Sequence, residues 1–312
     1  MDYVKLGRNG PRVSAVGTGT WQAGDDTWGP DVTDRDCVDA IVRAAELGMN
    51  LVDTAENYGR GHSEEVLSQA IRKAGRENVF VATKVSDHHL RPEDVAKACD
   101  GSLRRLGIRH IDLYQVHWTD PYDQVPLVKT MRAMERLERQ GKVGHIGVSN
   151  FAVRDLEEAR SSLSRTDIVS DQVQFNLLHR NVEVEVLPYC KRERISILAY
   201  SPLARGALTG KYRPTRRPSD QVRSRDVFFR AANLQRIRAL LVAMKRIATG
   251  HRTTLPPVAL AWLRSRPGVI PIPGAKRPAQ SEQNAAGGGL SLSRSERAVL
   301  DRLSGQLHLD TF

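Results

Sequence analysis

Residues 33–53, TDRDCVDAIVRAAELGMNLVD, contain one helix pattern followed at once by one strand pattern. Thr33 is suited to cap a helix, with Asp36 three residues further on, and Gly48 stands where that helix would end. Between them, apolar side chains recur at helical spacing, at Val38, Ile41, Val42 and Ala45. The stretch therefore predicts a helix that leads directly into a strand over 49–53.

The same alternation continues along the chain. Strands are predicted where short apolar runs follow helix patterns such as 63–74, 92–107 and 124–140. With the first strand placed at 13–17, the eight predicted strands are 13–17, 49–53, 79–84, 111–116, 143–148, 172–175, 195–200 and 269–272. Short connections between alternating helices and strands require parallel strands with right-handed crossovers. Eight such units favour an α/β fold of the closed (β/α)8 TIM-barrel type over an open doubly wound sheet.

Two segments lie outside this alternation. Residues 3–12 predict a short β-hairpin around Asn9-Gly10 ahead of the barrel. Residues 200–233, after the seventh strand, show no clear periodicity and are rich in Pro, Gly and Arg. A long loop of this composition is expected to cover the mouth of the barrel, and a disordered insertion is the alternative. We expect residues 1–312 to form one domain.

The composition is that of a globular protein, with 40% hydrophobic and 27% charged residues. No apolar run approaches the roughly 18 to 20 residues of a membrane span, and no signal-peptide pattern opens the chain. A cytoplasmic protein without a membrane partner is therefore expected. The three cysteines, Cys37, Cys99 and Cys190, are far apart and odd in number, which predicts buried thiols rather than disulfides. No metal site is expected.

The net charge of +11 indicates an anionic partner. Arginine is concentrated between Arg205 and Arg238, and no nucleic-acid-binding motif accompanies it. We therefore expect a phosphate-bearing cofactor and no nucleic acid. The oligomeric state is not indicated by the sequence.

Four ionisable residues are predicted at the C-terminal ends of neighbouring strands, where barrel enzymes place their chemistry. They are Asp53, Tyr58, Lys84 and His117. Taken singly, each has an ordinary structural explanation, such as a helix cap, packing or a solvated charge. Their occurrence together at one end of the barrel favours a catalytic group.

The group suits the reduction of a carbonyl. A hydride that reaches the carbonyl carbon leaves negative charge on oxygen, which needs hydrogen-bond donors and then a proton. Tyr58 would supply the proton, and the Lys84 cation would lower the pKa of the phenol. Asp53 would keep Lys84 charged, and His117 would orient the substrate oxygen. Since no side chain delivers a hydride, a nicotinamide cofactor is needed.

Several short runs, in order and nearly over the whole chain, resemble the aldo-keto reductase family. They are Asn50 to Gly59, Thr83-Lys84, His117-Trp118, Gly147 to Asn150, Gln172 to Asn176, Tyr200 to Leu203 and Ile272 to Lys276. The resemblance implies an NADP-dependent oxidoreductase that reduces aldehydes or ketones to alcohols, with the four residues above in the stated roles. Some members act instead as NADP-binding regulatory subunits, so a redox-sensing subunit with little turnover is the alternative.

The resemblance also implies a cofactor site. The nicotinamide would stack on Tyr200, and the other contacts would come from Gly19, Thr20, Trp21, Asp53, Ser149, Asn150, Gln172, Ser201, Leu203, Gly206, Lys211, Gly274, Lys276, Gln280, Gln283 and Asn284. Lys276 beside Arg277 favours NADPH and NADP+ over NADH. The family often has Arg where Gln280 stands and Glu where Gln283 stands, and both departures weaken the expected preference.

Three tryptophans are expected to form the substrate pocket: Trp21, Trp28 and Trp118. Plain packing is the alternative, most of all for Trp28. Neither the identity of the carbonyl substrate nor the physiological direction of the reaction follows from the sequence.

Overall fold

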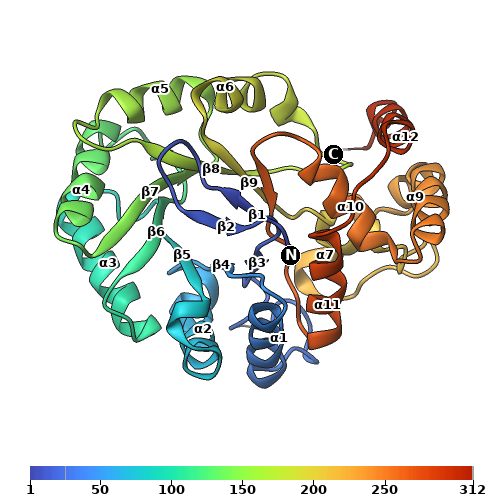
Figure 1. Cartoon of the computed structure of the whole chain (residues 1–312), viewed down its shortest axis with the longest axis horizontal. Helices are drawn as coiled ribbons and strands as arrows, with labels where there is room; N and C mark the ends of the chain where they lie inside the picture. The colour runs from blue at the N-terminus through green and yellow to red at the C-terminus, as the bar shows by residue number, and fades with distance from the viewer. Residues whose placement is uncertain (25, 311–312) are drawn as a thin grey trace.

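In the computed structural model, which describes residues 1–24 and 26–310, the chain forms a barrel of eight parallel strands (Figure 1). Neighbouring strands pair in chain order, from β3 to β10. The Gly17 N–H donates to the Pro271 carbonyl at 2.9 Å, and the Gly19 N–H donates to the Pro273 carbonyl at 3.0 Å. These bonds join the first strand to the last, so the predicted (β/α)8 barrel is confirmed. The strands are β3 Thr18–Gly19, β4 Leu51–Asp53, β5 Phe80–Val85, β6 Ile111–Val116, β7 Val143–Ser149, β8 Ile168–Gln174, β9 Ser196–Tyr200 and β10 Val269–Pro271.

Helices surround the strands as an outer ring (Figure 1). The last helix before each of the strands β4 to β10 is α1 Asp34–Glu46, α2 His62–Ala74, α3 Pro92–Leu106, α4 Leu127–Arg139, α5 Val153–Ser161, α6 Val186–Glu193 and α10 Leu255–Arg264 in turn, and α11 Pro278–Gly287 follows β10. The Thr33 side chain accepts from the Asp36 N–H, as predicted. Helix α4 begins later than the predicted residue 124, because the N–H groups of Gln124 and Val125 donate to Asp120 instead. No helix within residues 1–24 and 26–310 is long and apolar enough to cross a membrane.

An antiparallel hairpin of β1 Tyr3–Lys5 and β2 Arg12–Ser14 crosses the N-terminal opening of the barrel (Figure 1). The hairpin is as predicted, but its left-handed turn residue is Gly7 rather than Asn9 or Gly10. The prediction of a first barrel strand at 13–17 is wrong. Val13 pairs with Val4 inside the hairpin, and the chain joins the barrel only from Gly17 onward, with β3 at Thr18–Gly19. An apolar run shows that a strand is buried, but not which neighbour it pairs with.

The core has two parts. Between the strands and the helices lies a large apolar layer, which includes the fully buried Trp262 and Phe175. Inside the barrel, a smaller cluster joins the hairpin to the strands through Leu6, Val13, Leu51, Ala82, Leu113, Val169, Leu198, Ile270 and Ile272. All three cysteines are buried and free, as predicted.

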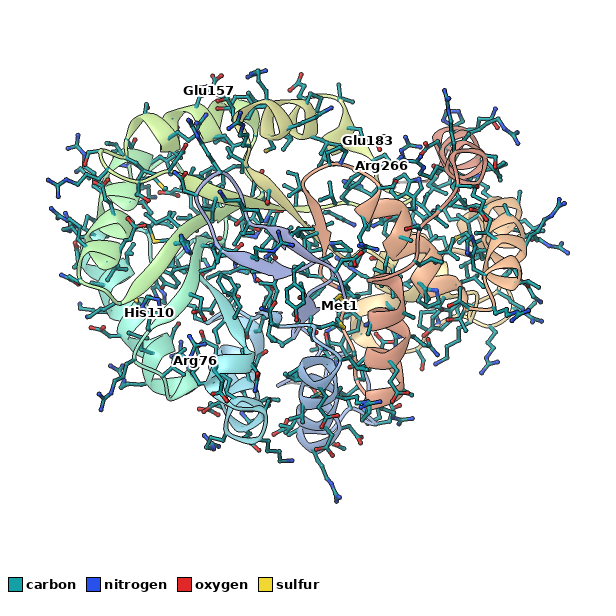
Figure 2. The ribbon with its side chains drawn as sticks, viewed as in Figure 1. Met1, Arg76, His110, Glu157, Glu183 and Arg266 are labelled. Carbon is teal, nitrogen blue, oxygen red and sulfur yellow. The ribbon has the colours of Figure 1, made fainter. Side chains whose placement is uncertain are left out.

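Polar contacts tie neighbouring units together outside the barrel (Figure 2). Arg76, which precedes β5, donates to the carbonyl of His110, which precedes β6, at 3.1 Å. Glu183 lies in the 3-10 turn η3 Asn181–Glu183, and it contacts Arg266 in the turn before β10 at 3.5 Å. Such contacts fix each unit against the next.

The segment after β9 is ordered into short helical pieces rather than one irregular loop. It contains the 3-10 turns η4 Ala204–Thr209 and η5 Val227–Phe229 and the helices α7 Gln221–Ser224 and α8 Ala231–Arg236, after which α9 Arg238–Gly250 begins. None of these pieces is long enough to give a readable hydrophobic period. The remaining elements are α12 Arg294–Gly305 near the C-terminus and the 3-10 turns η1 Tyr58–Gly61 and η2 Arg76–Asn78.

Candidate active site

A cavity with a volume of about 560 Å³ opens at the C-terminal ends of the barrel strands. This volume is within the range typical of small-molecule sites. All but three of the predicted site residues line it. The three exceptions are Lys84, which is fully buried beneath the cavity, and Gln283 and Asn284, which lie behind it in α11.

Hydrogen bonds from Lys84 connect two other predicted catalytic residues, Asp53 and Tyr58. Its Nζ lies 2.6 Å from Asp53 Oδ1, 2.7 Å from the Thr54 carbonyl and 3.2 Å from the Tyr58 hydroxyl. Asp53 is the last residue of β4, Lys84 lies near the end of β5, and Tyr58 lies in the loop after β4. Lys84 and Asp53 are 0% and 2% exposed, so this ion pair is screened little by solvent.

Burial and neighbouring charges have opposite effects on the pKa of Lys84, and likewise on the pKa of Tyr58. Burial lowers the pKa of Lys84, but the Asp53 carboxylate, with help from Tyr58, more than offsets it and leaves the pKa raised. Burial raises the pKa of Tyr58 more than the Lys84 cation lowers it, so its net pKa is also raised. From the sequence we expected a lowered pKa for the phenol, because the burial of Tyr58 was not known. The phenol is therefore held in its protonated form beside a charged ammonium.

His117 follows β6 directly and is 9% exposed. Its ring lies edge-on to Tyr58, with 5.7 Å between the ring centres. Burial, with the nearby Lys84 charge, lowers the pKa of His117 to about 3. The imidazole is therefore neutral at physiological pH and can act as a hydrogen-bond donor but not as a charge.

Two amide side chains hold the other oxygen of Asp53. Gln115 and Gln172 donate to Asp53 Oδ2 at 3.1 and 2.8 Å. Gln115 was not predicted as a site residue, although it is the register partner of Lys84 on the next strand. A polar residue near the C-terminal end of a mostly apolar strand, level with a candidate lysine, was the available signal. Gln172, predicted to hold the nicotinamide, has its amide N–H engaged with Asp53.

Ser149, Asn150 and Tyr200 form a connected rim along the ends of β7 and β9. The Tyr200 hydroxyl donates to Asn150 Oδ1 at 3.1 Å, and Asn150 Nδ2 donates to Ser149 Oγ at 2.9 Å and to the His117 carbonyl at 3.1 Å. Asn150 takes a left-handed φ of 62°. The network fixes this part of the rim of the cavity.

Trp21 and Trp28 form an aromatic wall next to Tyr58. Trp28 meets Trp21 edge-on at 5.0 Å, and Trp21 lies 6.4 Å from the Tyr58 ring. Trp118 also lines the cavity but is 47% exposed. The three predicted tryptophans thus meet at one cavity, with Trp118 at its outer edge.

Basic side chains surround the rest of the opening. Lys276 Nζ donates to the Trp28 carbonyl at 2.6 Å, and burial, with the neighbouring Arg223 charge, lowers its pKa to about 8. Arg223 lies over the Trp28 ring at 5.8 Å and donates to the Tyr212 hydroxyl at 2.7 Å. Arg205, Arg223 and Arg277 line the cavity but were not predicted as site residues. The high arginine content could be seen in the sequence, but the sequence did not show which arginines face the cavity.

The model of the Aldo/keto reductase family matches residues 15–304. The chain belongs to the aldo/keto reductase family. It is 39% identical to an uncharacterised oxidoreductase of Mycobacterium tuberculosis, over 96% of this chain and 92% of that protein. It is 31% identical to the NADH-specific methylglyoxal reductase of Escherichia coli, over 98% and 99%. It also matches a crystal structure of an aldo/keto reductase from Klebsiella pneumoniae in complex with NADP and acetate, with a TM-score of 0.77 and 32% identity over 96% of each chain.

In this aldo/keto reductase, contacts between the loops after β3 and β4 support the predicted catalytic residues. The pairing of Gly19 with Asp53 in the sheet sets the first loop against the second. Thr20 then donates to the Asp53 carbonyl at 3.0 Å, and its hydroxyl also lies 2.8 Å from Ser63 Oγ, so its side chain supports the site from behind.

Proposed function

We propose that this aldo/keto reductase reduces aldehydes or ketones to alcohols with a hydride from NADPH. The observation that supports the proposal most is the contact of Lys84 Nζ with both Asp53 and the Tyr58 hydroxyl at hydrogen-bonding distance. A protonated phenol beside a buried ammonium, at the floor of a cavity, is suited to protonate a developing alkoxide. Packing alone would not require a buried lysine at this point.

The residues at the cavity fit a dinucleotide. Tyr200 offers a ring for stacking, and Ser201, Leu203, Gly206 and Lys211 follow it along the wall, where they would hold the pyrophosphate. Lys276, with Gln280, would hold the adenosine end, and Arg277 lies beside them. The adjacent cations favour the phosphorylated cofactor. NADH is the alternative, since a relative is named as NADH-specific.

The proposed roles follow from charge and position. When bound, the nicotinamide supplies a hydride to the carbonyl carbon of the substrate. Tyr58 donates its proton to the carbonyl oxygen, where negative charge would otherwise collect. Lys84 stabilises the phenolate that remains, and Asp53 keeps Lys84 charged. Neutral His117 donates a hydrogen bond that orients the oxygen toward Tyr58.

The segment 200–233 is proposed to cover the bound cofactor. Tyr212 and Arg223 of this segment line the cavity, and the Val222 N–H donates to the carbonyl of Thr27, in the loop after β3, at 3.3 Å. A bound dinucleotide would thereby lie between this segment and the barrel.

The substitution Tyr58→Phe tests the role of the phenol. It removes the proton donor and leaves the ring, so kcat for aldehyde reduction should fall about 10²- to 10⁴-fold while the Kd for NADPH is nearly unchanged. Steady-state rates and a fluorescence titration of NADPH measure the two quantities. A variant that retains the wild-type rate would show that Tyr58 is not the acid.

Wild-type turnover separates the enzyme from a regulatory subunit. We expect NADPH oxidation with a panel of aldehydes well above the rate without substrate. Tight NADPH binding with no such increase would favour the redox-sensing alternative.

A further inference from the structure

Arg205 lies against the aromatic wall of the cavity next to Tyr58. Its guanidinium carbon is 5.2 Å from the centre of the Trp21 ring, and Trp21 in turn lies against Tyr58. Arg205 lines the cavity, and its side chain is 25% exposed. One aromatic ring therefore separates the proposed proton donor from a fixed positive charge.

The backbone around Arg205 adopts an unfavourable conformation. Ala204 and Arg205 have φ values of 48° and 53°, and Gly206 follows at 105°. The left-handed region is disfavoured for residues with a Cβ, and such strain is concentrated at functional sites. If the chain only had to reverse direction here, glycine at all three positions would adopt these φ values at a lower cost in free energy. The chain carries an arginine at 205 instead, at the cost of this strain.

Asp226 holds the guanidinium in place without enclosing it. Its Oδ2 lies 2.7 Å from Arg205 Nη1, while its Oδ1 accepts from the Phe228 N–H at 2.8 Å. A guanidinium carries five N–H donors in a planar fork. The Arg205 Nε–H is buried and has no hydrogen-bond partner within residues 1–24 and 26–310, so a ligand can meet only the exposed quarter of the side chain. The ion pair thus fixes the side chain over Trp21 and leaves donor capacity for a ligand.

We infer that Arg205 selects carbonyl substrates that carry a second, carboxylate group. The inference rests on the proposed reductase function. A planar guanidinium is suited to a planar carboxylate, and the aromatic wall favours a flat spacer between the two ends of the substrate. An aldehyde at Tyr58, a ring along Trp21 and a carboxylate at Arg205 would use all three features.

Two aldehydes of the same shape test this inference: 4-carboxybenzaldehyde, which is anionic, and 4-formylbenzamide, which is neutral. Wild-type enzyme should prefer the acid in kcat/KM. Arg205→Met should reduce that preference about tenfold or more, which corresponds to the loss of a charge-assisted hydrogen bond, and leave the rate with the amide within a few-fold. Arg205→Lys should retain part of the preference. Arg216→Met removes the same charge from an exposed position on the same loop and should leave the preference unchanged.

The outcomes are distinct. Equal losses for both aldehydes, with weaker NADPH binding, would assign Arg205 to the cofactor and overturn the inference, as would a wild-type enzyme without preference for the acid. Wild-type enzyme that reduces neither aldehyde would contradict the reductase function itself. If Arg205→Met is unstable because Asp226 is left unpaired, the double variant Arg205→Met/Asp226→Asn restores neutrality and should show the same loss of preference.

Discussion

Lys276 is a cation whose charge depends on pH in the neutral range. Its pKa is lowered to about 8, so the ammonium is present below pH 8 and is lost as the pH rises above it. If Lys276 contacts the ribose phosphate, the Kd for NADPH should rise about tenfold between pH 7 and 9.5, and the Kd for NADH should change little. Fluorescence titrations of both cofactors across this range measure the effect.

Lys276→Met is the control at the same position. It should weaken NADPH binding at pH 7 and flatten the pH dependence, because no titrating ammonium remains. Parallel pH curves for the two cofactors in the wild-type protein would argue against a phosphate contact at Lys276.

At the scale of elements, the first two active-site loops are held together through two glycines. A Cβ on Gly59, at a left-handed φ of 54°, would lie 2.5 Å from the Gly24 carbonyl oxygen. Gly59 follows Tyr58 directly, so a shift of this loop moves the phenol. Gly59→Ala should therefore destabilise the protein by about 2–4 kcal/mol and lower kcat for carbonyl reduction. Denaturant unfolding and steady-state rates check both effects.

Gly141 provides a matched control. It has a similar φ of 72°, but a Cβ there meets nothing within 4 Å, and it lies in the turn before β7, at the other end of the barrel. Gly141→Ala should cost about 1 kcal/mol and leave kcat unchanged. If Gly59→Ala behaves in the same way, the close approach of the two loops does not position Tyr58.

The elements also show what could be predicted from sequence. Strand β6 lies exactly where its apolar run was, since period and length are local properties. The first barrel strand was misplaced because pairing is not local, and Val13 has the same character in a hairpin as in a barrel. Asp53, Tyr58, Lys84 and His117 were found because each ends or follows a strand. Gln115 was missed because it lies inside its predicted strand, 111–116, whereas Lys84 ends its predicted strand, 79–84. The Lys276 contact with Trp28 depends on loops without a period.

For the whole molecule, the two ends of the barrel should separate stability from chemistry. The hairpin fills the N-terminal end: Leu6 is fully buried in the inner cluster, and the Gly7 N–H donates to Ser196 Oγ at 2.8 Å. Leu6→Ala should lower the free energy of unfolding by about 2–5 kcal/mol, because it leaves a cavity among packed side chains. The kcat of the folded protein should be unchanged, because the cavity that holds Tyr58 opens at the opposite end.

Val242→Ala is the control for Leu6→Ala. It removes apolar atoms from a side chain that is 62% exposed, and should change the free energy of unfolding by less than about 0.5 kcal/mol. Urea unfolding followed by fluorescence, with kcat measured well below the midpoint, compares the two variants. A large fall in kcat for Leu6→Ala under fully folded conditions would mean that the packing inside the barrel reaches the active site. The inner cluster would then position Lys84 and Asp53 as well as supporting the strands, and the two ends of the barrel would act as one.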